Sequence, residues 1–480
     1  GHAATLSGGG RLFGAANWRL GGTDNPRAGH PPAGGLSARA TLFRYVASAV
    51  ETTRLNVLDE LYLHLDREEE AWSVHLEIRV EGRIDGARLE AAVREAARLH
   101  PIARARLADT RATDVRYQWE IADELGELDL DEVDCGSADD LARARERLLG
   151  RTPALDRPGP FAILLAHDPS GDVIALNLHH AAGDGLAALR LMGSIARAYA
   201  GAEDPLPAVD ALAVRDVAAI AGPDSIAERL TRGRAALDYL ARGVSTPARI
   251  AAEGESDRPG YGFEFLTFEP EEVEAIAGLR SDGATVNDVL LGGLAVAVRR
   301  WNESHDTGSG AVYLMMPINL RPPEWRFEVV GNFASYVSVR LGSGDQPTLE
   351  AAIQAAAAST RRIKDGGVAG LIVDLFNPPT LLPTGLKKRM GDLIPLTGNV
   401  VVDTAVLSNL GRIQSVPHLG DAGAVRELWF SPPGRMPLGA SFGAATLDDR
   451  LFVTLRYRHP QFDRAAAAGF LATFRDVLVD

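Results

Sequence analysis

The chain has 480 residues, 46 % of them hydrophobic and 24 % charged, which is long enough to build at least two hydrophobic cores. Its net charge of −14 argues against a dedicated nucleic-acid-binding protein, because such proteins neutralise phosphates with Lys and Arg. No apolar run approaches the roughly 20 residues of a membrane-spanning helix, so we expect no transmembrane segment. The single cysteine, Cys135, excludes an internal disulfide framework. Since the start also lacks a signal-peptide pattern, we expect a cytoplasmic protein.

The first part of the chain alternates between strand and helix patterns. Residues 1–40 are rich in Gly, Pro and Ala and predict a flexible leader, which Trp18 could anchor to a surface. Segment 72–80 alternates like a half-buried strand, and Asp85 is placed to cap a helix that follows it. A second helix is expected over 138–149. Two apolar strands, 160–168 and 172–180, are joined by a turn and lead into a further helix.

The second part repeats this mixture without a residue-level repeat. Strands are predicted at 261–269, 311–320, 334–341, 399–411 and 450–458, and helices at 271–279, from Thr285, at 349–364 and from Asp463. We therefore predict an α/β fold with a leader (1–40), an N-terminal subdomain (41–201), a connector (202–258) and a C-terminal subdomain (259–480). A crevice between the two subdomains is a natural place for a small-ligand site.

One stretch concentrates the candidate chemistry: "LNLHHAAGDGL", residues 176–186. Adjacent side chains on a strand point to opposite faces, so His179 and His180 cannot easily hold one metal ion together. No HExxH pattern is present, and a catalytic zinc requires three protein ligands. We therefore expect no metal site, which leaves a buried structural pair or a general base.

The sequence around His180 favours the general base. His180 shares its strand face with Ile174, Leu176 and Leu178, and an imidazole at the end of such a face is kept neutral by desolvation. The residues that follow, Ala-Ala-Gly at 181–183, are too small to block access to the ring. Asp184 can cap the next helix with its side chain.

The segment "HHAAGDG" matches HHxxxDG, the signature of the condensation-domain and chloramphenicol-acetyltransferase-like superfamily of acyltransferases. Further segments resemble that superfamily in the same order: "IDGARLEAAVREAARLHP", "GPFAILLAHDPSGDVIALN", "MPINLRP", "VVGNFAS" and "AVLSNLGRI". The resemblance covers roughly residues 45–480. The DFGWG motif of the plant BAHD branch is absent, so the chain looks closest to free-standing bacterial polyketide-associated or condensation-type acyltransferases.

The resemblance implies two chloramphenicol-acetyltransferase-like subdomains that form a V, with a substrate tunnel at their interface. It implies direct transfer of an acyl group to a hydroxyl or amine of a small, natural-product-like acceptor, with His180 as general base. The donor would be a thioester of coenzyme A or of carrier-protein phosphopantetheine, with no covalently bound cofactor. His179, Asp184, Gly185 and Arg321 would support the loop, with Arg321 paired to Asp184.

The oxyanion of the reaction needs hydrogen-bond donors, and the candidates are the backbone N–H of Gly185 at a helix start and the polar pair Ser408 and Asn409. Two alternatives stay open at this point. The same fold and motif could epimerise or cyclise a chain bound to a carrier protein, or the chain could be a non-catalytic docking or scaffold protein.

Overall fold

The computed structural model describes residues 51–67, 70–205, 208–223, 225–241, 247–254, 259–280, 283–308, 310–366, 368–390, 402–414, 418–434, 436 and 438–479. The chain divides into two units, Gly1–Ala49 and Val50–Asp480, and all described residues belong to the second. The predicted leader at 1–40 and its Trp18 lie outside the described residues.

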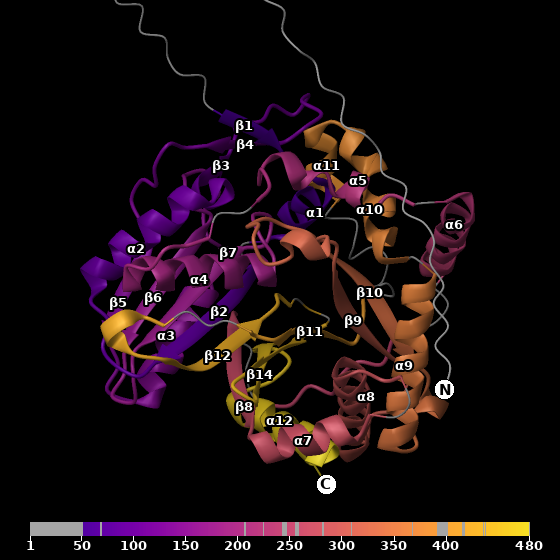
Figure 1. The fold of residues 1–480 in the computed structure, drawn as a ribbon. Coiled ribbons are helices and arrows are strands. Elements are labelled where there is room, and N and C mark those ends of the chain that lie inside the picture. The colour runs from indigo at the N-terminus through magenta and orange to yellow at the C-terminus, as the bar shows by residue number, and fades with distance from the viewer. Residues whose placement is uncertain are drawn as a thin grey trace, which may run out of the picture. The chain divides into compact units, whose positions relative to one another are not determined.

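Helices and strands are interspersed along this unit (Figure 1). The helices are α1 Val57–Leu65, α2 Gly86–Leu99, α3 Ala138–Leu149, α4 Gly185–Ala200, α5 Val217–Ile220, α6 Ile226–Ala241, α7 Pro270–Gly278, α8 Val286–Ser304, α9 Leu349–Asp365, α10 Leu371–Phe376, α11 Thr384–Met390 and α12 Arg464–Val479. The strands are β1 Glu51–Arg54, β2 Ser73–Val80, β3 Ala105–Leu107, β4 Gln118–Ile121, β5 Leu130–Asp134, β6 Phe161–His167, β7 Val173–His179, β8 Tyr261–Phe268, β9 Val312–Asn319, β10 Ala334–Leu341, β11 Ala405–Arg412, β12 Val425–Ser431, β13 Ala440–Leu447 and β14 Arg450–Arg458.

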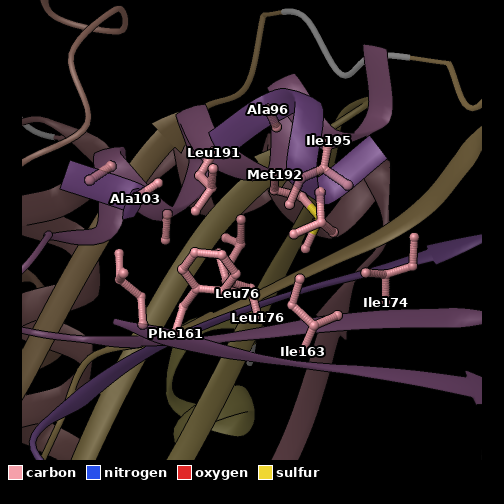
Figure 2. Packing of buried hydrophobic residues seen from close by; sticks show 14 of the residues in the cluster. Leu76, Ala96, Ala103, Phe161, Ile163, Ile174, Leu176, Leu191, Met192 and Ile195 are labelled. Carbon is pink, nitrogen blue, oxygen red and sulfur yellow. The ribbon is translucent and has the colours of Figure 1, made fainter. Parts of the chain in front are cut away.

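The first large sheet has the order β12-β2-β7-β6-β5 and is covered on both faces. Leu176 of β7 and its neighbours on that face pack beneath α2 and α4, in a core that includes Leu191 and Ile195 (Figure 2). The opposite face, represented by Ala175, packs against Leu148 and its neighbours on α3. A sheet covered on both sides needs strands that are apolar on both faces, which is why β6 and β7 read as continuous apolar runs.

The second large sheet has the order β10-β9-β11-β13-β14-β8. β11 runs parallel to β9 and β13, and the other neighbouring pairs are antiparallel. Helices α8, α9 and α12 contribute to the core beside this sheet, with Leu291, Ile353 and Phe470 among its buried residues. A small sheet, β1-β4-β3, completes the strands of the described part.

The predicted α/β fold class is confirmed. Asp85 caps α2 by accepting a hydrogen bond from the N–H of Arg88 at 2.7 Å. The predicted hairpin turn between β6 and β7 is also present, and it depends on Gly171, which has a φ of +118°. A Cβ at Gly171 would lie 2.1 Å from the carbonyl oxygen of Val80, so both the conformation and the close approach require glycine.

Strand β12 departs from the simple division into two halves. It comes late in the sequence, yet it pairs antiparallel with β2 at the edge of the first sheet. Its neighbour in sequence, β13, belongs to the second sheet. The subdomain boundaries at 41–201, 202–258 and 259–480 therefore stay predictions, and the C-terminal segment completes the sheet that carries the histidine loop.

Candidate active site

The histidine loop joins the end of β7 to the start of α4. His179 is the last residue of β7, and the N–H of His180 still donates to the carbonyl of Trp72 at 3.0 Å beyond the end of the strand. Helix α4 begins at Gly185, and the Oδ1 of Asp184 accepts from the N–H of Ala187 at 3.0 Å. The loop is thus held by strand pairing on one side and by a helix cap on the other.

The imidazole of His180 lines a cavity of about 480 Å³ while only 8 % of the residue is exposed. Burial lowers the pKa of His180 to about 4, and the Asp184 carboxylate offsets only part of this effect. The ring is therefore neutral at pH 7. Nδ1 is buried against the loop, where hydrogen bonding to the backbone of His180 and Gly183 acts to raise the pKa, so Nε2 is the ring nitrogen available to a ligand.

Tyr62 of α1 covers one face of the His180 ring. The two rings are stacked, with centroids 4.0 Å apart and planes inclined by 18°. The hydroxyl of Tyr62 donates to the carbonyl of Ala334 at 2.9 Å, which fixes the phenol in this orientation. Tyr62 thus holds the imidazole plane and excludes water from one side of it, and nothing in the sequence analysis singled it out.

Asp184 and Arg321 form a buried ion pair. Arg321 Nη1 donates to Asp184 Oδ2 at 2.7 Å, and the backbone N–H of Phe333 donates to the same oxygen at 2.8 Å. Burial acts to raise the pKa of Asp184, but the charge of Arg321, its hydrogen bond and the backbone N–H groups of Phe333 and Ala187 together hold that pKa below its usual value. The pairing of Arg321 with Asp184, expected from the family resemblance, is present in the structure. Asp184 therefore links the histidine loop to residues of the second half of the chain.

The segment 329–334 surrounds this ion pair and reaches the histidine. Arg321 Nη2 donates to the carbonyl of Gly331 at 2.8 Å. The side-chain Nδ2 of Asn332 donates to the backbone carbonyl of His180 at 2.9 Å. The backbone carbonyl of Asn332 accepts from Asn56 Nδ2 at 3.0 Å. Asn56 caps α1, the helix that carries Tyr62. One short segment therefore ties together the histidine loop, the arginine and the stacked tyrosine.

His179 faces away from His180 and contributes to the loop rather than to the cavity. Its Nδ1 accepts a hydrogen bond from the N–H of Ala181 at 3.0 Å, and its Nε2 lies 3.8 Å from the Oδ2 of Asp66. Asp66 in turn accepts from Thr152 Oγ1 at 2.8 Å. These contacts fit the supporting position that the sequence predicted for His179.

The three candidate oxyanion donors differ in their placement. Gly185 and Ser408 both line the cavity. Asn409 is not among the lining residues, because it follows Ser408 on β11 and adjacent strand residues face opposite ways. Its side-chain oxygen accepts from the N–H of Gly411 at 2.8 Å and so serves a local turn. Two of the three candidates therefore line the same cavity as His180, and Asn409 does not.

Beyond these groups the cavity wall is largely apolar. A buried ion pair interrupts it, with Lys387 Nζ 2.7 Å from Glu60 Oε2. Among the described residues, no cluster of three or more His, Cys, Asp or Glu side chains is arranged to hold a metal ion. No helix in that same part of the chain is both long and apolar enough to cross a membrane.

Comparison with known proteins identifies the family. The family model described as "Condensation domain" matches residues 61–373. The chain belongs to the condensation-domain family, whose members form amide or ester bonds or epimerise. This confirms the resemblance read from the HHxxxDG segment.

Two sequence relatives and several solved structures of the same fold are similar to this chain. Uncharacterized proteins of Mycobacterium tuberculosis strains CDC 1551 and H37Rv are each 36 % identical over 441 residues, which cover 89 % of this chain and 99 % of the relative. The first condensation domain of the CDA synthetase is 16 % identical with a TM-score of 0.63, covering 90 % of this chain and 97 % of that domain. The epimerization domain from the third module of tyrocidine synthetase B is 15 % identical with a TM-score of 0.61, covering 89 % and 97 %. At these identities the solved structures show the shared fold.

Proposed function

We propose that this condensation-domain protein is an acyltransferase that moves an acyl group from a thioester to a hydroxyl or amine of a small-molecule acceptor. The donor is an acyl-coenzyme A or an acyl-carrier protein, and no bound cofactor is needed. The observation that carries the proposal is the uncharged His180 imidazole, which lines a large cavity and stacks on the Tyr62 ring, while the backbone carbonyl of His180 accepts from the Asn332 amide.

In the proposed reaction Nε2 of His180 takes the proton of the acceptor O–H or N–H as that atom attacks the thioester carbonyl. The tetrahedral intermediate then breaks its C–S bond, and the proton on His180 passes to the departing sulfur to give a free thiol. A positioned base of this kind typically contributes about 10²–10⁴-fold to the rate.

Negative charge develops on the carbonyl oxygen during this attack. The backbone N–H of Gly185 lies at the start of α4, where the helix dipole favours an anion, and the Ser408 hydroxyl also lines the cavity. We assign these two groups as oxyanion donors. Asp184 and Arg321 act on the reaction only through the loop they hold.

The test is turnover of a panel of acyl thioesters with alcohol and amine acceptors, read by mass spectrometry. His180→Ala should lower kcat by at least about 10²-fold with an unchanged far-UV spectrum. The matched control, His418→Ala, removes an exposed imidazole and should leave the rate intact. Equal turnover by wild type and His180→Ala would refute the role of His180.

The same panel separates the alternatives. Deuterium exchange at a substrate α-carbon without ester or amide product would assign the chain to the epimerising members of the family. Binding of an acyl-carrier protein with no chemical change in any substrate would leave only a docking function.

A further inference from the structure

The cavity beside His180 has an apolar wall built from the second sheet. Met315 of β9 and Val406 of β11 are direct cross-strand partners, and both line the cavity. Pro317 of β9 and Tyr336 of β10 form a second partnered pair on the same wall. Because alternate strand residues share a face, these four side chains form one continuous apolar surface.

A helix supplies another part of the wall. Val57, Leu61 and Leu65 of α1 line the cavity at a spacing of four residues and therefore form one stripe along the helix. With a rise of about 1.5 Å per residue, this stripe extends the apolar lining over about 12 Å. The same helix carries Tyr62, so the lining runs directly to the His180 ring.

The charged side chains of the wall are already neutralised. Glu60 is paired with Lys387, and Asp184 is paired with Arg321. Burial and the nearby Lys387 lower the pKa of His64 to about 4, so this imidazole is uncharged at pH 7. Among the described lining residues, no carboxylate is left for the ammonium group of an aminoacyl substrate, whose burial without a partner is costly.

We propose that this cavity binds a long aliphatic acyl chain and places its thioester carbonyl at His180. This rests on the proposed acyl transfer and adds the class of donor: fatty acyl thioesters rather than aminoacyl thioesters. Binding is then driven by burial of methylene groups, each of which strengthens affinity by about fourfold while space remains.

Direct binding tests this without turnover. S-acyl-N-acetylcysteamine thioesters with chains of 2, 8 and 14 carbons, and the glycyl thioester, are titrated by calorimetry into the full-length His180→Ala variant. The tetradecanoyl probe should bind at least 100-fold more tightly than the acetyl probe, and the glycyl probe no better than acetyl. Affinity that does not change with chain length, or glycyl binding as tight as octanoyl, would overturn the inference.

Cavity-filling variants locate the chain. Met315→Trp and, as a second and smaller change, Val406→Phe should each weaken tetradecanoyl binding by at least tenfold and acetyl binding by much less. The control Leu230→Trp enlarges a side chain that is 64 % exposed on α6 and outside the cavity, and should change neither. Long-chain affinity that is unchanged in both folded cavity variants would place the chain elsewhere.

These outcomes are separable from the acyltransferase assay. Chain-length-dependent binding without any acyl product from the wild type would refute the proposed function and leave this inference standing. Product formed from aminoacyl thioesters alone would support the proposed acyl transfer and refute the preference for fatty acyl donors.

Discussion

Replacing Arg321 by Met should destabilise the fold by about 3–5 kcal/mol, the usual cost of removing one partner from a buried ion pair. The Arg321 side chain is 0 % exposed and that of Asp184 is 3 % exposed, so the remaining carboxylate cannot be compensated by water. The variant also loses hydrogen bonds to the carbonyls of Val329 and Gly331. A typical folded domain is stable by only 5–15 kcal/mol, so the effect is large.

Urea unfolding followed by tryptophan fluorescence at pH 7 measures this change. The control is Arg326→Met, which removes an exposed arginine from the same stretch of chain and should cost within about 0.5 kcal/mol. In a double-mutant cycle, Asp184→Asn should remove most of the additional cost of Arg321→Met, because the two side chains act as a pair. Equal losses for Arg321→Met and Arg326→Met would show that the pair does not hold the loop.

The free energy of unfolding measured in this way should depend on pH in a definite direction. The pKa of Asp184 is lower in the folded protein than its usual value of 3.8, so the pair stabilises the fold fully above about pH 4. This contribution is lost as pH falls through the folded-state pKa. The difference between wild type and Arg321→Met should therefore shrink below pH 4, and a difference that grows on acidification would contradict this linkage.

Three further predictions concern the site. Because burial lowers the pKa of His180 to about 4, kcat/KM should decline on the acid side near pH 4, and a midpoint near 6.5 would show a solvated ring. Tyr62→Ala should move that midpoint upward by admitting water, whereas Tyr62→Phe, which keeps the stacked ring, should move it little; equal pH profiles for both variants would exclude the stacking role. Gly185→Ala should destabilise the protein by about 1–3 kcal/mol, because the new Cβ would lie 2.8 Å from the Phe430 ring. Gly233→Ala on α6 meets nothing within 4 Å and should be neutral or slightly stabilising in the same unfolding assay.

Local patterns along the chain were sufficient for most elements of the fold. Strands such as β2, β7 and β14 follow from apolar periodicity, and the starts of α2 and α8 follow from Asp85 and Thr285, because a cap is a contact within one turn. The HHxxxDG segment likewise located His180 and Asp184, since a short motif needs no knowledge of the rest of the chain.

The contacts of this motif with distant residues and strands were not predicted from local sequence patterns. Tyr62 lies on a short helix that was not among the predicted elements, although Val57, Leu61 and Leu65 repeat every four residues there. Asn332 was inside a segment quoted for its resemblance, but its bond to His180 joins residues 152 positions apart. The pairing of β12 with β2 joins residues still farther apart in the sequence. No local sequence pattern indicates which sheet a strand will join.

The order of amino acids therefore established the α/β class, the superfamily and the identity of the candidate base, all of which depend on neighbours in the chain. Packing between segments distant in the sequence determined the properties of the site. It made His180 neutral by burying it, stacked Tyr62 on its ring, placed Asn409 outside the cavity, and assembled a largely apolar cavity whose wall includes α1 and strands β9, β10 and β11. These properties arise from desolvation and close contact, which exist only once the chain has folded.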